Sequence, residues 1–477
     1  MERVRIIRIG AIGGAVGMVS GILIHSIALA IAVAILAGAF SFFIKTKSGI
    51  IPLFVYFCIG GLVLGSVRMM FLHVPTLPVS SFKEVSGFIS EYPDLRGDVV
   101  RYTVSASCFD GTCFPKASRI LVESQVYPLY SYGDVVRVSG KPHIVSRSSD
   151  TYDAYLQSLD ISASMQFAKV YKEGDGKGNV VTRKLFALRD VFSHTIADAL
   201  PEPESGLLKG MLLGEKHALG KKLEDDFKRA GLSHIVVLSG YNLMLVFALF
   251  FSCSKFITLR FAPVLSFVGV ALFVVLSGGE PAALRAAGMI ALISLALFLR
   301  HSKSASHSLA LTVIGFSLWD PLVASSVSFM LSALATYGMV EWEPIITPFL
   351  NKKLPWLGRI SDVVSETLSA QIIVSPLILY IAGTISPFSI MSNILVIPLI
   401  PCAMVLGLIA SLFSFLVTPL SLVSLPALIV LKYIVYVAHL FAQLPLIPIP
   451  VTAFIVWALS IFFVFYPLYR KKETPHA

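Results

Sequence analysis

Hydrophobic residues occur along this chain in long blocks that are separated by short polar connections, and one polar stretch (73–232) interrupts the series. Because about 20 consecutive apolar residues make one helical span, the pattern predicts a polytopic α-helical membrane protein with about 12 spans. The predicted spans are Ile9–Ile24, Ile27–Ile44, Ile50–Leu72, Ser233–Phe251, Phe261–Ser277, Ala282–Leu299, Ala305–Trp319, Leu322–Val340, Val363–Ala382, Phe388–Val417, Leu420–Leu444 and Val451–Tyr469.

Some of these blocks depart from a simple span. Phe388–Val417 is long and contains Pro398 and Pro401, and proline breaks or kinks a helix. We therefore expect a broken or re-entrant helix there, which is tolerated at membrane depth only inside protein or beside water. The first block is also compatible with a cleaved signal peptide. Its glycines at four-residue spacing favour a retained, packed helix.

Within the polar stretch, residues 73–182 show strand-like runs separated by turn residues, which predicts an inserted small all-β domain. Five short strands favour an OB-like barrel, and a small sandwich is the alternative. The predicted strands are Val85–Ser90, Asp98–Ser107, Arg119–Glu123, Asp134–Gly140 and Ile161–Val170.

Residues 183–232 show helical spacing but are neither long nor apolar enough to span. They predict amphipathic helices that lie at the membrane interface and lead the chain back into the bilayer. The chain then divides into three N-terminal transmembrane helices (1–72), a β domain (73–182), the interfacial helices (183–232) and a second transmembrane domain (233–477).

Charge is distributed unevenly along the chain. The formal net charge is +10, yet the stretch 73–232 carries 20 Lys and Arg against 20 Asp and Glu. The positive excess lies in alternate short loops, where it indicates orientation more than a nucleic-acid partner. It places both termini in the cytoplasm and residues 73–232 outside a bacterial cytoplasmic membrane. The basic clusters are Arg3, Arg5 and Arg8; Lys45 and Lys47; Lys255 and Arg260; Arg300 and Lys303; Lys352, Lys353 and Arg359; Arg470, Lys471 and Lys472.

Motifs of catalysis and metal binding are missing from the sequence. It has no Walker A loop and no HExxH pair. Ser239-Gly240 is not a nucleophile elbow, because Val237 stands where the first glycine belongs. We therefore expect no catalytic residue, no metal and no cofactor.

Two cysteines flank a hairpin-turn signal in the polar stretch. Cys108 and Cys113 enclose Phe-Asp-Gly-Thr, and Asp-Gly is a strong turn dipeptide. On the outer side of the membrane a disulfide would staple this hairpin. Two unpaired strand cysteines are the alternative.

Polar residues also occur inside the apolar blocks. His234, Ser239 and Asn242 stand in one such helix, where each needs a partner or water. They indicate either hydrogen bonds between helices or a pore-facing helix that kinks at Gly240.

Two cations fall within predicted spans. Arg285 lies about one turn inside its span, where it either snorkels to the interface or offers a phosphate-binding guanidinium. Lys432 lies near the middle of its span, and we expect it to face the bundle interior. There it would pair with Glu366 or line a polar path.

The run Gly231-Leu-Ser-His-Ile-Val-Val-Leu-Ser-Gly-Tyr-Asn242 resembles the ComEC family of competence proteins, in which Gly-Leu-x-His leads into an apolar helix bearing Ser-Gly. Asn242 stands where the family commonly has a second His, so a role that depends on that histidine does not transfer. Further segments resemble the family: Leu207–Gly214, Arg285-Ala286, Asp320-Pro321 with Ser328–Ser332, Asn393 with Pro398, Tyr132-Gly133-Asp134 and Tyr152–Leu156.

The resemblance implies a channel component that passes single-stranded DNA across the cytoplasmic membrane in natural transformation. It implies membrane lipids as surroundings, and a separate nuclease and a cytoplasmic motor protein as partners. A homo-oligomer is compatible with it. It also implies an OB-like external domain that stacks bases on aromatic rings, although strand aromatics are more often core. The candidates are Tyr102, Phe109, Phe114, Tyr127 and Tyr130.

Two other classes of function remain open at this point. A secondary transporter or lipid flippase would use the broken helix at 388–417 in mid-membrane. A non-transporting membrane scaffold would have a dry bundle, with Arg285 and Lys432 paired or snorkelled.

Overall fold

The computed structural model describes most of the chain between Leu77 and Pro448. The described residues are 77, 82–145, 151–236, 240–254, 261–279, 281–298, 305–319, 326–358, 360–386, 388–413, 422–445 and 447–448. The predicted spans within 9–72 and 451–469 lie outside them, as do Ser239 and Asp320.

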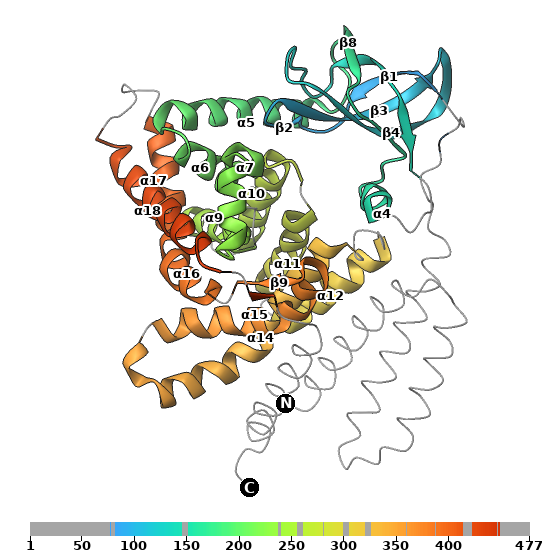
Figure 1. Ribbon diagram of the computed structural model, residues 1–477. Coiled ribbons are helices and arrows are strands. Elements are labelled where there is room, and N and C mark those ends of the chain that lie inside the picture. The colour runs from blue at the N-terminus through green and yellow to red at the C-terminus, as the bar shows by residue number, and fades with distance from the viewer. Residues whose placement is uncertain are drawn as a thin grey trace, which may run out of the picture.

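The polar stretch begins with a β domain of eight strands and one helix (Figure 1). Its strand order is β6-β7-β4-β3-β1-β5-β8, and β2 pairs with β3. The core is apolar and includes Val100, Val104, Ile120 and Val136, none of which is exposed. The elements are β1 (Glu84–Ile89), β2 (Asp94–Arg96), β3 (Val99–Phe109), β4 (Thr112–Gln125), β5 (Val135–Ser139), β6 (Pro142–Ile144), α4 (Thr151–Ser158), β7 (Ala163–Met165) and β8 (Lys169–Gly174).

The strand registers connect the two ends of this order. Ser139 of β5 pairs with Lys169 of β8, and Pro142 of β6 pairs with Met165 of β7, so both pairs belong to one antiparallel ladder. β5 also pairs with β1, and β7 pairs with β4 in parallel. Counting β5–β6 and β7–β8 as two interrupted strands, the five long strands pair around a ring.

The predicted strands coincide with β1, β3, β4 and β5, but the short strands β2 and β6 were not predicted, and the domain differs from the prediction in two further ways. The segment Ile161–Val170 is divided into β7 and β8 by a kink. Helix α4 makes the domain β-rich rather than all-β. Its Leu156 is fully buried against Leu121 and Ile161, so the helix closes one end of the core.

Short helices connect the β domain to the bundle: α5 (Val180–Ala199), α6 (Glu204–Leu213), η1 (Lys216–Leu219), α7 (Lys221–Arg229) and α8 (Ser233–Val236). Helix α5 starts at an Asn179 side-chain cap and ends before Pro201, as predicted. Helix α6 departs from the interfacial arrangement expected for 183–232. It is buried along nearly its whole length, because it packs against α17 and α18 instead of presenting a polar face.

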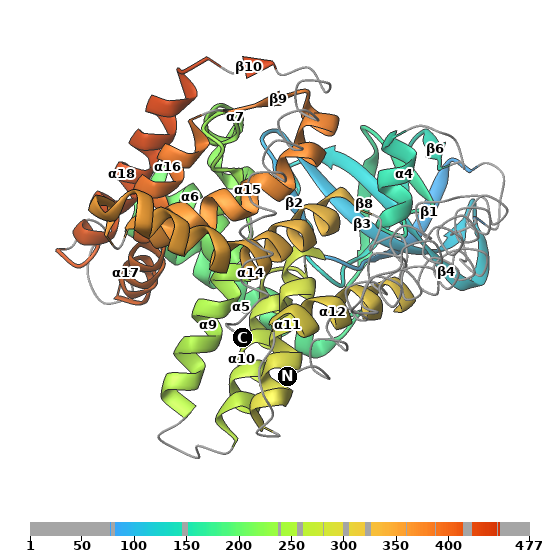
Figure 2. The ribbon, with the colours of Figure 1, turned by 90° about the horizontal axis from the view of Figure 1, so that it is seen from below.

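The bundle contains α9 (Gly240–Ser254), α10 (Ala262–Leu276), α11 (Pro281–Phe298), α12 (Ala305–Trp319), α14 (Val327–Lys353), η2 (Pro355–Leu357), α15 (Ile360–Ala382), α16 (Ser389–Val396), η3 (Ile397–Leu399), α17 (Ile400–Phe413) and α18 (Leu425–Ala442). Short strands β9 (Thr384–Ile385) and β10 (Ile447–Pro448) pair beside it. Helices α9, α10 and α11 run side by side (Figure 2). At Pro398 the helix tightens into the 3-10 turn η3, but Ile397 and Ile400 keep helical backbone angles and 389–413 continues as one segment, so the predicted break is not confirmed.

Three helical segments are long and apolar enough to cross a membrane: Ser361–Leu379, Ser389–Phe413 and Leu425–Ala442. Four shorter apolar helices accompany them, within α9, α10, α11 and α12. Helix α14 extends further than its predicted span, through Pro344 and Pro348 to Lys353. The described residues therefore form a membrane protein with a β domain. In Figure 1 the β domain and the α14–α15 hairpin lie at opposite ends of the described part of the protein.

Candidate functional site

The side chain of Arg285 is buried in the first turns of α11 and is 3% exposed. Its Cζ lies 5.1 Å from the ring centroid of Phe329 in α14, within the range of a cation–π contact. Its Nη1 has no hydrogen-bond partner in the described part of the chain. A buried charge is costly unless it is paired. This guanidinium therefore has unused capacity to bind an anion.

Other segments that resemble the family lie next to this arginine. A Cβ added at Gly240 of α9 would lie 3.5 Å from the Cβ of Ala286, so the first turn of α9 faces α11 here. Ser328 is exposed and immediately precedes the buried Phe329. We call Gly240, Arg285, Ser328 and Phe329 the arginine site. It brings together segments that are far apart in the sequence.

A second polar group forms where α7 ends against α16. Gly231 has φ 76°, and a Cβ there would lie 2.4 Å from the Cβ of Ser389. The hydroxyl of Ser392 donates to the carbonyl of Ala230 (2.7 Å), and Gln371 of α15 donates to Ser389 Oγ (2.6 Å). The glycine is thus required for close approach, and Ser392 satisfies the carbonyl of Ala230 at the end of α7, while Ser389 donates to the carbonyl of Ser386.

This second group also contains unpartnered polar atoms. Asn393 is 8% exposed and its Oδ1 has no hydrogen-bond partner among the described residues. The same holds for Gln371 Oε1 and Thr367 Oγ1, one turn apart on α15. Buried polar atoms without partners normally indicate water or a ligand. Asn393 therefore remains a candidate site residue.

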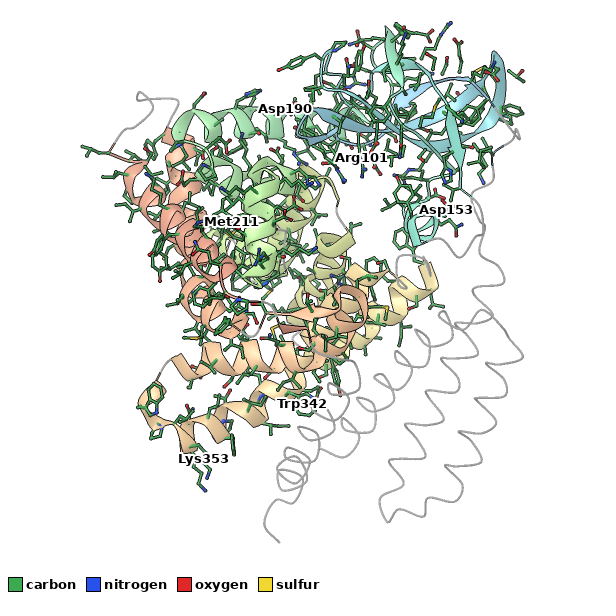
Figure 3. All side chains as sticks on the ribbon, viewed as in Figure 1. Arg101, Asp153, Asp190, Met211, Trp342 and Lys353 are labelled. Atoms are coloured by element: carbon green, nitrogen blue, oxygen red, sulfur yellow. A yellow bond between two sulfur atoms is a disulfide. The ribbon has the colours of Figure 1, made fainter. Side chains whose placement is uncertain are left out.

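Of its two predicted roles, hydrogen bonding between helices or facing a pore, Asn242 has the first. It is 2% exposed, and its Nδ2 donates to the carbonyl of Met211 in α6 over 3.3 Å. Met211 lies inside the bundle in Figure 3. Asn242 thus connects two helices, as polar residues in membrane helices commonly do.

The structure does not bring the remaining predicted residues to either group. Pro398 is exposed in η3, whereas His234 of α8, also exposed, is an exception, because it is hydrogen-bonded to the backbone of Gly231 in the second group. The interior position predicted for Lys432 is wrong for the described residues, because its side chain is exposed on α18. The buried face of α18 is formed by Leu431, Ile434, Val437 and Ala438, and Lys432 is displaced from it by the 100° turn per residue. Glu366, its predicted partner, is also exposed.

A cluster that the sequence pattern does not reveal lies at the junction of the β domain and the bundle. Arg189 of α5 is 4% exposed, and its Cζ lies 3.9 Å from the ring centroid of Tyr92. It also donates to Glu215 and to the carbonyl of Leu276, which is the last residue of α10, each over 3.4 Å. We call this the arginine clamp. Leu188 and Val191, on either side of Arg189, are exposed, so the helical spacing of apolar residues in α5 did not reveal that this arginine is buried.

Tyr92 completes the clamp from the β domain. Its hydroxyl donates to Asp190 over 2.6 Å, and its ring meets Phe186 edge-on. Burial raises the pKa of Tyr92, and the hydrogen bond to the Asp190 carboxylate raises it further. In Figure 3 Asp190 lies beside the β domain, and Lys353 lies at the far end of the helical bundle.

The β domain holds the predicted disulfide between Cys108 and Cys113. Most of its predicted stacking aromatics belong to the core instead, because Tyr102, Phe109 and Tyr130 are buried. Tyr127 is 85% exposed. Over the described part of the chain, no His, Cys, Asp or Glu residues are grouped so as to hold a metal ion.

The long apolar helices, with buried polar groups between them and a β domain beside them, define an integral membrane protein. Residues 211–472 match the family model described as Competence protein, and the chain belongs to this family, that of ComEC. It is similar to ComE operon protein 3 of Bacillus subtilis (strain 168), with 23% identity over 229 residues. That match covers 48% of this chain and 29% of the relative. No solved structure matches the chain.

Proposed function

We propose that this protein is a component of a competence system that conducts single-stranded DNA across the bacterial cytoplasmic membrane. The membership of the Competence protein family supports a role in DNA uptake. The observation that carries the conducting role is the arginine site, where a buried guanidinium keeps a donor unpartnered among the described residues.

The chemistry of this site suits a nucleic-acid backbone. A guanidinium offers fixed donors that match phosphate oxygens, and burial strengthens such a contact. Phe329 holds Arg285 in place without consuming its donors. Gly240 carries no side chain, and Ser328 adds an exposed hydroxyl beside Phe329. In this role Arg285 would bind each passing phosphate weakly and release it.

The proposed arrangement in the membrane has about 12 spans, both termini in the cytoplasm and residues 73–232 outside. The disulfide supports the outer location of the β domain, since such bonds persist in oxidising compartments. The ring of five long strands supports an OB-like domain. A separate nuclease and a cytoplasmic motor would complete the system, and a homo-oligomer is compatible with it.

The test is import of labelled DNA into the cytoplasm of a transformable host that carries variants of this chain. Arg285→Ala should lower import at least about tenfold, because one charge-assisted contact to phosphate is lost. Arg285→Lys should restore part of it through the retained charge. Lys353→Ala, which removes an exposed cation from the end of α14, is the matched control. Undiminished import by Arg285→Ala protein at normal abundance would remove the conducting role.

One observation favours a second candidate. The helix α16–η3–α17, which tightens at Pro398, carries Asn393 with an unpartnered Oδ1 within the described residues, and such a site would suit a secondary transporter or lipid flippase. That function predicts that Asn393→Ala abolishes transport of a small molecule or lipid while DNA import continues. A non-transporting scaffold predicts that neither variant changes any flux.

A further inference from the structure

The loop between α10 and α11 leads directly into the arginine site. Helix α10 ends at Leu276, α11 begins at Pro281, and Arg285 follows about one turn later. The loop includes Gly278 and Gly279, with φ 90° and 70°. A helix rises about 1.5 Å per residue, so Arg285 lies only about 6 Å along α11 from its first residue. The path of this loop therefore affects where the guanidinium lies.

Arg189 of the arginine clamp completes the end of α10. The carbonyls of residues 273–275 accept hydrogen bonds from the backbone amides of residues 277–279, over 2.9–3.1 Å. The last carbonyl, that of Leu276, accepts from Nη1 of Arg189 over 3.4 Å. A helix leaves its last four carbonyls without partners inside the helix, and a cation at this end also suits the helix dipole. The cap of α10 is thus completed by a side chain from α5.

The same guanidinium lies against the loop itself. A Cβ added at Gly278 would lie 3.1 Å from Nη1 of Arg189, whereas a Cβ added at Gly279 would have nothing within 4 Å. Both glycines have positive φ, which strains any other residue at either position. Of the two, Gly278 is the one that faces Arg189. The loop therefore fits closely around the clamp at this residue.

Arg189 is itself held from two sides. Its Cζ lies 3.9 Å from the ring centroid of Tyr92, and its Nε donates to Glu215 over 3.4 Å. The Glu215 carboxylate also accepts from the hydroxyl of Ser193 over 3.2 Å, which orients it. Because Arg189 is 4% exposed, it has little room to move. It is therefore a fixed support for the loop.

The β domain holds Tyr92 through the residue before it. The hydroxyl of Thr103 in β3 donates to the Glu91 carboxylate over 2.7 Å, and Arg119 of β4 forms an ion pair with the same carboxylate. A continuous series of contacts thus runs from the sheet through Tyr92 and Arg189 to the loop that precedes α11.

We infer that Arg189 is a positioning residue for the arginine site, because it fixes the α10–α11 loop against the β domain and thereby sets where Arg285 lies. Arg189 acts through this loop and does not contact DNA. The inference rests on the proposed function, since Arg285 must contact the strand. A binding group needs to be held within about 0.5 Å of its productive position, so a loosened loop weakens the contact with phosphate.

An engineered disulfide measures the position of α11 in the purified full chain in lipid nanodiscs. A Cβ at Gly240 would lie 3.5 Å from the Cβ of Ala286, a separation that suits a disulfide. With the cysteines outside the β domain replaced, Gly240→Cys and Ala286→Cys should crosslink on mild oxidation. Arg189→Ala should slow this crosslink at least about threefold, because the Cβ atoms must approach to about 4 Å. Lys184→Ala, at an exposed site on α5, should leave the rate unchanged.

The two loop glycines provide a matched pair in which Arg189 is intact. Gly278→Ala should slow the crosslink and lower DNA import at least about threefold more than Gly279→Ala, because its methyl group is forced against the guanidinium. Gly279→Ala has a similar backbone strain without that contact. Equal effects of the two variants would show that strain alone is responsible, and would overturn the inference.

DNA import shows whether Arg189 acts through Arg285. At equal protein abundance, Arg189→Ala should lower import at least about threefold, and Arg189→Lys should restore part of it by returning a cation to the end of α10. In an Arg285→Ala background, Arg189→Ala should cause no further loss of the residual import, because residues that act through one contact are not additive. Losses that multiply would show a merely structural role and contradict the inference.

Failure of this inference and failure of the proposed function give different results. If Arg189→Ala leaves the crosslinking rate unchanged while Arg285→Ala lowers import, the positioning role is wrong and the proposed function stands. If Arg189→Ala slows the crosslink while Arg285→Ala imports normally, Arg189 positions α11 but the conducting role of the arginine site is wrong.

Discussion

Arg189 and Arg285 are both almost fully buried, and their surroundings differ. Arg189 contacts the Tyr92 ring, the Glu215 carboxylate and the carbonyl that ends α10. Arg285 lies over the Phe329 ring, and its Nη1 has no partner among the described residues. A guanidinium with its donors in use holds structure together, whereas one with a donor to spare is able to bind a ligand.

Removal of the Arg189 guanidinium should therefore loosen the junction. Arg189→Ala removes the positive charge beside the Glu215 carboxylate and opens space beside Tyr92. We therefore expect a loss of about 2 kcal/mol in the free energy of unfolding. Hydrogen exchange should increase in the segment between β1 and β2. Lys184→Ala, at an exposed site on the same helix, is the control. Unchanged exchange in the Arg189 variant would show that the clamp does not hold the β domain.

The pKa of Tyr92 predicts a dependence of stability on alkaline pH. Because the folded-state pKa is raised above 10.0, the folded protein holds the phenol proton more tightly than the unfolded chain. The stabilisation is complete below about pH 10 and is lost as pH rises above that value. The melting temperature of the unaltered protein should thus fall more steeply between about pH 9 and pH 11 than that of Tyr92→Phe. Parallel curves would contradict this.

At the scale of elements, close approach decides where helices lie. A Cβ at Gly338 of α14 would lie 2.4 Å from the carbonyl oxygen of Ser369 in α15. The hydroxyls of Ser365 and Ser369 donate to carbonyls one turn earlier in α15, so these small polar residues face α14 with their hydrogen bonds already made within α15. The close packing of α14 against α15 thus requires glycine at position 338.

Gly338→Ala should therefore separate the hairpin and destabilise the protein by about 1–3 kcal/mol. Gly315→Ala in α12 is the matched control, because nothing lies within 4 Å of its added Cβ. The control should be neutral or stabilising, since alanine favours helix over glycine. Thermal unfolding in detergent measures both, and equal melting temperatures would refute the close contact.

The positions of many strands and helices were predictable from the sequence. Strand alternation and turn residues placed β1, β3, β4 and β5, and proline marked the position of η3, although the helix continues through it. Periodicity alone did not show that α6 is internal, because its partners α17 and α18 follow it by nearly 200 residues. It also did not show which face of α18 is buried, and Lys432 was misplaced for that reason. Arg285 was predicted as a site residue, but its contact with Phe329 could not be predicted without knowing how α11 and α14 pack.

At the scale of the whole molecule, the clamp and the end of α14 mark opposite sides. Asp190 lies beside the β domain, and Lys353 lies across the bundle from it (Figure 3). The basic residues predict that the β domain is outside and Lys353 is inside.

This orientation predicts the accessibility of introduced cysteines. In a background with Cys58, Cys253 and Cys402 replaced, Lys116→Cys should react with a membrane-impermeant maleimide in intact spheroplasts. Lys353→Cys should react only after permeabilisation. The opposite pattern would invert the topology.

The most direct test of the central claim is photocrosslinking at the arginine site during DNA import. A photoreactive amino acid at Ser328, which is exposed beside Phe329, should crosslink to incoming single-stranded DNA. The same group at Leu440, an exposed position of α18, should not. Import that continues without a crosslink at 328, or with an equal crosslink at 440, would contradict a path for DNA past Arg285.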